Sequence, residues 1–234
     1  MNRIVRNIPN SITCLNILFG TMAIIFAAYG DRIVAGVAAY RLSWLFIGVA
    51  AVADFCDGFA ARLLKAYSEM GKELDSLCDN VSFGVAPAAL ICFSLHDCGA
   101  PDWLCWMPML IPVATALRLA KFNLDTRQTT SFLGLPVPAN ALFWIGYSSA
   151  LYDGAYGVAK PFVVIAVILL MAALMLSELP LLSLKFKSFG WKGNAGRWIL
   201  IAGVLAIVGC LGISGLIWII PLYVVVSVLN TRLK

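Results

Sequence analysis

The sequence is poor in charged residues, and this scarcity excludes a soluble globular domain. Only 12% of the 234 residues are Asp, Glu, Lys or Arg, whereas 62% are hydrophobic. In a soluble domain roughly a quarter of the residues are charged and about half are apolar. One soluble core cannot bury this much apolar surface, so we predict that the chain uses lipid as its solvent.

Histidine is nearly absent, and the cysteines lack the spacing of a metal site. His96 is the only histidine, and the seven cysteines form no CxxC pair. A Cys/His zinc site is therefore not predicted, and we interpret His96 as a surface or capping residue. Cys98 and Cys105 flank one predicted loop and could form a disulfide. A basic patch with interleaved aromatics is also missing, which argues against nucleic acid as a partner.

Long uncharged runs are abundant. A spanning helix needs about 20 mostly apolar residues, and we expect an all-α integral membrane protein with about eight transmembrane helices (six to eight). The last two are separated by little more than Gly212, Ser214 and Gly215, and they could form a tight hairpin or one bent element. The predicted spans are 11–29, 33–53, 74–95, 103–122, 137–152, 158–180, 198–213 and 216–230.

The basic residues predict an orientation. With eight spans and a cytoplasmic N-terminus, 14 of the 17 Lys and Arg residues lie on the inner side, and only Arg32, Arg41 and Lys160 lie outside. Lys and Arg favour the cytoplasmic side of membrane proteins. We therefore expect both termini in the cytoplasm and the protein in the cytoplasmic (inner) membrane.

We predict a single polytopic domain over residues 1–234, with catalytic core helices in 10–140 and C-terminal helices in 141–234. Residues 1–9 form a juxtamembrane segment that alternates apolar and basic residues. This pattern suits a short amphipathic helix on the membrane surface. The alternative is a positively charged flank to the first span.

Four acidic residues lie beside lipid, where charge is costly and is usually functional. Asp54 and Asp57 are three residues apart and Asp75 and Asp79 are four apart, so each pair shares one face of a helix. Two antiparallel helices can direct all four carboxylates into one space. Divalent cations would offset their repulsion, and ligands that are all oxygen favour Mg²⁺ or Mn²⁺.

Small residues and one arginine accompany the acids. Gly58 and Ala61 share the helical face of Asp54 and Asp57, where they leave room for a nucleotide or for a neighbouring helix. Arg62 supplies a planar cation suited to phosphate, and Gly71 permits a turn into the third span. The combination indicates a metal–diphosphate site. The alternatives are a structural network of the acids with Arg62 and Lys65, and a cation-transport site.

The stretch from Asp54 to Asp79 matches, without departure, the pattern D-x2-D-G-x2-A-R-x8-G-x3-D-x3-D and thereby resembles the CDP-alcohol phosphotransferase family. The resemblance implies an all-helical, usually dimeric fold, with a site that opens to the cytoplasmic leaflet and holds two divalent cations. It implies that Asp54, Asp57 and Asp75 bind the metals and that Asp79 is both a ligand and the general base. The nucleotide-lipid residues that it implies, together with their small neighbours, are Asn10, Thr13, Gly58, Ala61, Arg62, Ser68 and Gly71.

Two downstream elements bear on the acceptor alcohol. Residues 115–123 and 132–140 resemble, in order and separation, elements of the membrane-spanning phosphatidylserine synthases within this family. The resemblance implies CDP-diacylglycerol and L-serine as substrates. Arg118 and Lys121, near the inner end of the fourth span, could meet the serine carboxylate, and Asn123 could donate or accept hydrogen bonds.

Other interpretations of these elements stay open. The acceptor could be glycerol 3-phosphate or an inositol phosphate. Arg118, Lys121 and Arg127 could serve only topology or the lipid phosphates, and Gly134, Pro136 and Pro138 could only shape a loop. Outside the family, the acids could belong to a membrane prenyltransferase or a non-enzymatic cation carrier.

Overall fold

The computed structural model describes residues 3–125, 132–182, 190 and 194–232, and the regular structure in this part of the chain is almost entirely helical. This confirms the predicted all-α fold. The longer helices are α1 (Arg3–Ala28), α2 (Ala39–Leu63), α3 (Glu69–Asp79), α4 (Ala86–Asp97), α6 (Leu110–Leu124), α7 (Val137–Tyr152), α8 (Pro161–Leu176), α9 (Ala195–Leu211) and α10 (Leu216–Arg232).

Short elements connect these helices. A π-helix, η1, joins α3 to α4, and two antiparallel bridges of two residues per strand pair β1 with β2 and β3 with β4. Their bounds are β1 (Ile33–Val34), β2 (Val37–Ala38), η1 (Asn80–Val85), α5 (Asp102–Cys105), η2 (Met107–Met109), β3 (Phe132–Leu133), η3 (Tyr156–Ala159), β4 (Pro180–Leu181) and η4 (Gly212–Gly215).

Five helical runs among the described residues are long and apolar enough to cross a membrane. The chain is therefore an integral membrane protein. The shorter apolar helices α7 and α8 have 16 residues each, which is roughly 24 Å at 1.5 Å per residue. The five runs are Asn7–Ala28, Ala39–Leu63, Glu69–Asp97, Asp102–Leu124 and Ala195–Asn230.

The helices around the acidic residues differ from the predicted spans. The second span begins at Ala39 and not at residue 33, because residues 33–38 form the β1–β2 hairpin, and it continues to Leu63. The third begins at Glu69 and not at residue 74. The prediction followed uncharged runs, but helices tolerate charged residues beyond the apolar stretch. The extension places all four aspartates within regular helix.

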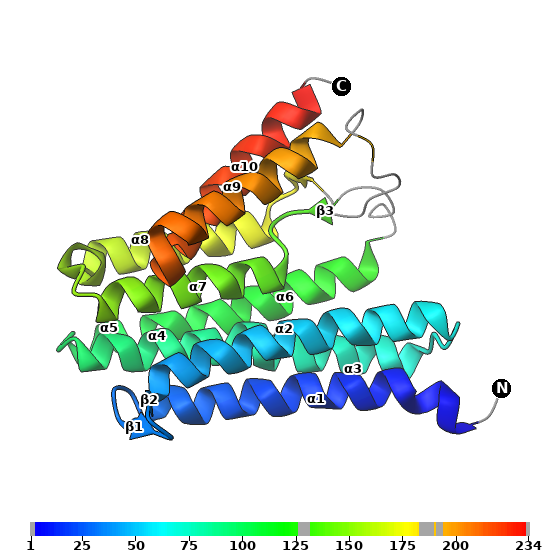
Figure 1. Ribbon diagram of the computed structural model, residues 1–234, viewed down its shortest axis with the longest axis horizontal. Coiled ribbons are helices and arrows are strands. Elements are labelled where there is room, and N and C mark those ends of the chain that lie inside the picture. The colour runs from blue at the N-terminus through cyan, green and yellow to red at the C-terminus, as the bar shows by residue number, and fades with distance from the viewer. Residues whose placement is uncertain (1–2, 126–131, 183–189, 191–193, 233–234) are drawn as a thin grey trace.

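The helices form a bundle in which α1 packs against α2, α3 and α4. Figure 1 shows the beginning of α1 and the end of α10 at the same end of this bundle, which is also the end where α2 leads into α3. The chain reverses between α9 and α10 at η4, where Gly212 has a φ of 63°. Of the two predicted alternatives for the last two spans, the tight hairpin is therefore the one observed.

Helix α1 includes the predicted juxtamembrane segment from Arg3 onward, without a break before the first span. Its direction changes near its beginning (Figure 1), in the part that contains Pro9. Proline lacks an N–H and commonly kinks a helix. The segment is thus the first turns of α1 rather than a separate helix.

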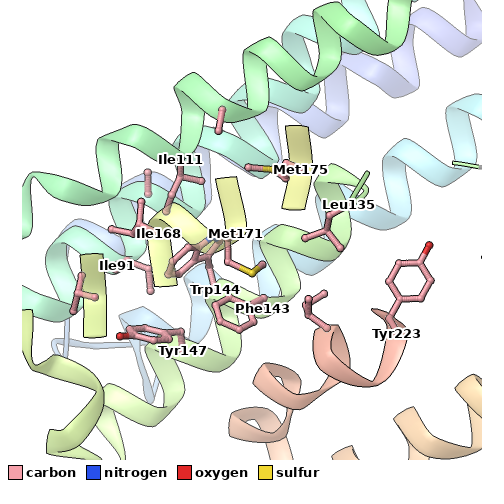
Figure 2. Packing of buried hydrophobic residues seen from close by; sticks show 14 of the residues in the cluster. Ile91, Ile111, Leu135, Phe143, Trp144, Tyr147, Ile168, Met171, Met175 and Tyr223 are labelled. Carbon is pink, nitrogen blue, oxygen red and sulfur yellow. The ribbon is translucent and has the colours of Figure 1, made fainter. Parts of the chain in front are cut away.

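The larger apolar core surrounds Trp144 of α7, whose side chain is fully buried. Figure 2 shows Trp144 beside Ile168 and Met171 of α8, with Phe143 of α7 on its other side. Helix α7 also makes polar contacts. Near its start, Asn140 Oδ1 accepts a hydrogen bond from Trp144 Nε1 (3.1 Å), and near its end the hydroxyls of Ser149 and Ser214 of η4 are hydrogen-bonded (2.9 Å). This core holds the C-terminal helices against α4 and α6.

The structure leaves the cysteines as free thiols. Cys98 Sγ donates to the Leu151 carbonyl and Cys105 Sγ to the Ala100 carbonyl. The disulfide considered from the sequence is therefore not formed in this structure.

Candidate active site

The turn between α2 and α3 brings the two acidic pairs together. Lys65, two residues after the end of α2, lies in the left-handed region with a φ of 50°, and Ala66 N donates to the Ala61 carbonyl (3.0 Å). Ser68 then begins α3, because its hydroxyl accepts from Gly71 N (3.0 Å) as an N-cap. The prediction that Gly71 permits the turn was wrong, since Lys65 adopts the unusual backbone and Gly71 lies in the first turn of α3.

Three of the four aspartates converge. One carboxylate oxygen from each of Asp54, Asp57 and Asp75 lies within 4.8 Å of the other two. The first two come from α2 and the third from α3, as the helical spacing predicted. Among the described residues this is the group of acidic side chains close enough to hold one metal ion.

Asp57 is the most deeply placed of these three. Only 5% of its surface is exposed, and its Oδ2 accepts no hydrogen bond from the described residues. The Thr13 hydroxyl of α1, which donates to the Pro9 carbonyl (3.0 Å), also lies within reach of this carboxylate. A buried carboxylate oxygen without a donor is costly, so Asp57 needs a positive partner.

Asp79 lies one turn further along α3 than Asp75 and is 8% exposed. It is not part of the group within 4.8 Å, although the charges of Asp54 and Asp75 act on it. Its Oδ1 accepts a hydrogen bond from Asn16 Nδ2 of α1 (3.1 Å).

Our sequence reasoning missed Asn16. It follows Thr13 by three residues, so the two share a face of α1, and this spacing is the signal that could have revealed it.

The acids are not neutralised by a network with Arg62 and Lys65. Among the described residues, the ion pairs within 4.0 Å are His96–Asp97 and Lys121–Glu178. The exposed Arg62 instead donates through Nε to the carbonyl of Gly58 in its own helix (2.9 Å). The structural alternative for the acidic cluster is therefore not supported.

The small residues near the acids play two different roles. A Cβ on Gly58 would meet no described atom within 4 Å, so this face of α2 is open beside the carboxylates. A Cβ on Gly71 would lie 2.9 Å from Asn10 Oδ1, so Gly71 allows α1 to approach α3. Ala61 is half-buried. The open face at Gly58 suits a ligand rather than a packed helix.

Of the predicted acceptor residues, Arg118 is the one that interacts electrostatically with an acid of the site, Asp79. It is 8% exposed, its guanidinium lies over the Phe122 ring (5.0 Å), and the charge of Asp79 acts on it, as does the phenol of Tyr223. Arg118 of α6 thus interacts electrostatically with Asp79 of α3 and with Tyr223 of α10.

Lys121 and Asn123 are engaged elsewhere. Lys121 Nζ pairs with Glu178 (3.4 Å) and donates to the Leu176 carbonyl (3.2 Å) at the end of α8. The Asn123 side chain donates to Ser76 Oγ (2.8 Å), and the backbone carbonyl of Asn123 accepts from Lys72 Nζ (2.9 Å). Both residues connect helices, and Arg127 lies outside the described residues.

Gly134, Pro136 and Pro138 shape the loop before α7, which is one of the two roles considered for them from the sequence. Gly134 has a φ of 75°, and a Cβ there would lie 2.5 Å from the Met175 carbonyl. Pro136 follows as the N-cap of α7, with Pro138 in its first turn. A side chain at position 134 would push the loop away from α8.

The residues present fit a divalent metal ion. Asp54, Asp57 and Asp75 offer only oxygen donors, which Mg²⁺ and Mn²⁺ prefer, and the unpartnered Oδ2 of Asp57 is directed to no protein cation among the described residues. These three carboxylates form a group that can hold such an ion.

Comparison with known proteins identifies the family of the chain. The family model for CDP-alcohol phosphatidyltransferases matches residues 6–209. The chain therefore belongs to the CDP-alcohol phosphatidyltransferase family.

Several curated relatives share one name, CDP-diacylglycerol–serine O-phosphatidyltransferase. The chain is 36% identical to that of Mycobacterium leprae over 59% of its own length and 45% of the relative's. It is 37% identical to that of Bacillus subtilis over 56% of its length and 69% of the relative's. It is 30% identical to that of Helicobacter pylori over 95% of its length and 90% of the relative's. The chain thus spans less than half of the mycobacterial relative but most of the Helicobacter one.

Proposed function

We propose that the protein transfers the phosphatidyl group of CDP-diacylglycerol to the hydroxyl of L-serine, giving phosphatidylserine and CMP. The observation that carries this proposal is the group of three carboxylates within 4.8 Å beside the open face at Gly58. Serine as the acceptor is supported by the name that the similar proteins share. Family membership also disfavours the prenyltransferase and the cation carrier.

Two divalent cations, Mg²⁺ or Mn²⁺, belong to this proposal. Asp54, Asp57 and Asp75 would hold them, with Asp79 as a further ligand. Bound divalent ions supply neutralisation of the diphosphate charge, which makes CMP a better leaving group. Four carboxylates in one region, none paired with a described cation within 4.0 Å, support this assignment.

The nucleotide lipid would lie on the open face of α2. Gly58 and Ala61 leave room there for the cytidine or the diphosphate, and the exposed Arg62 can turn from its own helix toward phosphate oxygens. Asn10 and Thr13 of α1, with Ser68 and Gly71 of α3, line the neighbouring side. The contact of Asn10 with Gly71 supports this grouping.

The reaction needs one proton acceptor. The serine Oγ attacks the phosphorus that bears the diacylglycerol, the P–O bond to CMP breaks, and the serine proton passes to Asp79. A carboxylate positioned for this transfer contributes about 10²- to 10⁴-fold to the rate. The burial of Asp79 and its hydrogen bond from Asn16 support a fixed carboxylate at this position.

Serine is a zwitterion, so its site must satisfy a carboxylate. Arg118 is the cation best placed for this, because it is buried and acts electrostatically on Asp79. Lys121 and Asn123 would contribute by holding α6 against α8 and α3.

The surroundings of the site are also part of the proposal. A cytoplasmic orientation of both termini and of the site is supported by the bias of Lys and Arg and by the shared end of α1 and α10 (Figure 1). Localisation to the inner membrane and the homodimer implied by the family resemblance stay predictions.

The proposal is tested by measuring CMP release from CDP-diacylglycerol by the purified protein with a panel of alcohols and Mg²⁺ or Mn²⁺. We expect release with L-serine and little with glycerol 3-phosphate or inositol phosphate. Release with glycerol 3-phosphate but not with serine would refute the acceptor.

The assignment of Asp79 as base has its own test. Asp79→Asn should lower kcat by at least about 100-fold, whereas Asp102→Asn, at the exposed start of α5, should not. Retained kcat in Asp79→Asn would refute the assignment.

A further inference from the structure

Helix α1 places one amide completely inside the protein. Asn16 is 0% exposed, and a buried amide is costly unless hydrogen bonds replace its water. Its Nδ2 donates to Asp79 Oδ1 at 3.1 Å.

The backbone around Asn16 is held independently of that amide. The Asn16 carbonyl accepts from Ser82 Oγ (3.0 Å), and a Cβ on Gly20 would lie only 2.7 Å from the Cα of Ser82. Helix α1 is therefore docked on η1 three residues beyond Asp79 by contacts that do not need the Asn16 side chain. The Asn16 side chain is therefore not needed for this docking, and its amide donates to Asp79.

Asp79 is the last residue of α3, and the π-helix η1 begins at Asn80. Such π-helical turns frequently occur at functional sites. The changed helical pitch leaves the carboxylate of Asp79 at a junction between two helix types, where a hydrogen bond from α1 fixes its rotation. One oxygen is held by Asn16, so the other is the one available to an acceptor proton.

We propose that Asn16 is a positioning residue for Asp79. Its amide holds Oδ1 and thereby turns Oδ2 toward the acceptor hydroxyl. This inference rests on the proposed function, in which Asp79 is the base. It assigns a role in the reaction to α1 through an uncharged side chain.

The test compares Asn16→Leu and Asn16→Asp with the control Ser82→Ala. Both Asn16 variants lose the donor, and the Asp variant keeps the shape of the side chain. Steady-state CMP release is measured over a range of Mg²⁺ concentrations, together with thermal unfolding in detergent. We expect kcat to fall about 10- to 100-fold in both Asn16 variants, with the KM values for CDP-diacylglycerol and acceptor within about twofold of wild type.

The control removes a buried hydrogen bond between α1 and η1 but leaves the amide of Asn16 in place. We expect unchanged kcat in Ser82→Ala. An equal loss in Ser82→Ala would show that helix docking matters rather than the amide, and it would overturn the proposal. Wild-type kcat in a folded Asn16→Asp, or full recovery of either Asn16 variant at higher Mg²⁺ concentration, would also overturn it.

Failure of the proposed function gives a different result. If the wild type releases CMP with another alcohol but not with serine, the acceptor is wrong, and the same Asn16 comparison with that alcohol decides the positioning role. If the wild type releases no CMP with any acceptor, both proposals are overturned.

Discussion

Asp57 shows most clearly why this site demands a cation. Its carboxylate lies in a membrane helix, is 5% exposed, and has an oxygen with no hydrogen-bond donor among the described residues. An unsatisfied buried polar group costs about 1–3 kcal/mol, and more when it is charged. Nearby Asp54 and Asp75 add repulsion, so a stable arrangement requires positive charge that the protein side chains do not bring.

The open face at Gly58 gives a test that separates binding from stability. Gly58→Ala should raise the KM for CDP-diacylglycerol about tenfold, because a methyl group fills the space that we assign to the ligand. Its unfolding temperature should stay the same or rise, since alanine favours a helix by up to about 1 kcal/mol over glycine. Both are measured on the purified variant.

Gly48 provides the matched control, because it lies in the same helix and a Cβ there also meets nothing within 4 Å. Gly48→Ala should leave the KM unchanged. An unchanged KM in Gly58→Ala would show that the ligand does not lie on this face.

Arg118 and Lys121 allow a second test at this scale. Arg118→Lys should raise the KM for serine about tenfold, because lysine cannot replace the planar fork of the guanidinium on a carboxylate. Lys121→Met should leave that KM unchanged, since Lys121 pairs with Glu178 and the Leu176 carbonyl. The measurement is CMP release against serine concentration, and the opposite ranking would contradict the assignment.

Sequence spacing predicted the convergence of Asp54, Asp57 and Asp75, because helical periodicity alone sets which residues share a face. The spacing of Asn16 from Thr13 places both on one face of α1, but it could not predict the contact of Asn16 with Asp79, which is 63 positions away in the chain. For the same reason sequence spacing could not distinguish Arg118, which interacts electrostatically with Asp79, from Lys121, which is held by α8.

The helices themselves were predicted better than their ends. Apolar runs located every long helix, but the boundaries of α2 and α3 depended on local chemistry that hydropathy does not contain: the hairpin before Ala39, the left-handed Lys65 and the cap at Ser68. These features bring the two acidic pairs together. The π-helix after Asp79 was not predicted from the sequence.

The close approach of α1 to η1 leads to a prediction about stability. A Cβ on Gly20 would lie 2.2 Å from Ser82 Oγ and 2.7 Å from the Ser82 Cα, so backbone must move to accommodate it. Gly20→Val should therefore destabilise the protein by about 1–3 kcal/mol. The check is thermal unfolding in detergent, and an unfolding temperature equal to that of wild type would contradict the packing of α1 on η1.

At the scale of the whole molecule, the structure is a bundle whose acidic pairs lie at the end where α2 leads into α3. The start of α1 and the end of α10 lie at that same end (Figure 1). Both facts agree with the bias of basic residues in the sequence. Sequence alone did not define the number of spans, because α7 and α8 are shorter than a full crossing helix.

The orientation can be measured with reporters. A fluorescent reporter that matures only in the cytoplasm should be active when fused after residue 234, and a periplasmic phosphatase should be active when inserted near Gly99, between α4 and α5. The expectation follows from the preference of Lys and Arg for the cytoplasmic side. Activity of the phosphatase at the C-terminus would contradict it.

The central claim is phosphatidyl transfer to serine at the acidic cluster, and product analysis tests it most directly. The purified protein is incubated with CDP-diacylglycerol, isotopically labelled L-serine and Mg²⁺ or Mn²⁺, and lipids and CMP are quantified by mass spectrometry. We predict labelled phosphatidylserine in one-to-one ratio with CMP, lost on chelation of the metal and in Asp57→Ala. CMP accompanied by unlabelled phosphatidic acid, or labelled phosphatidylserine that survives both treatments, would contradict the account.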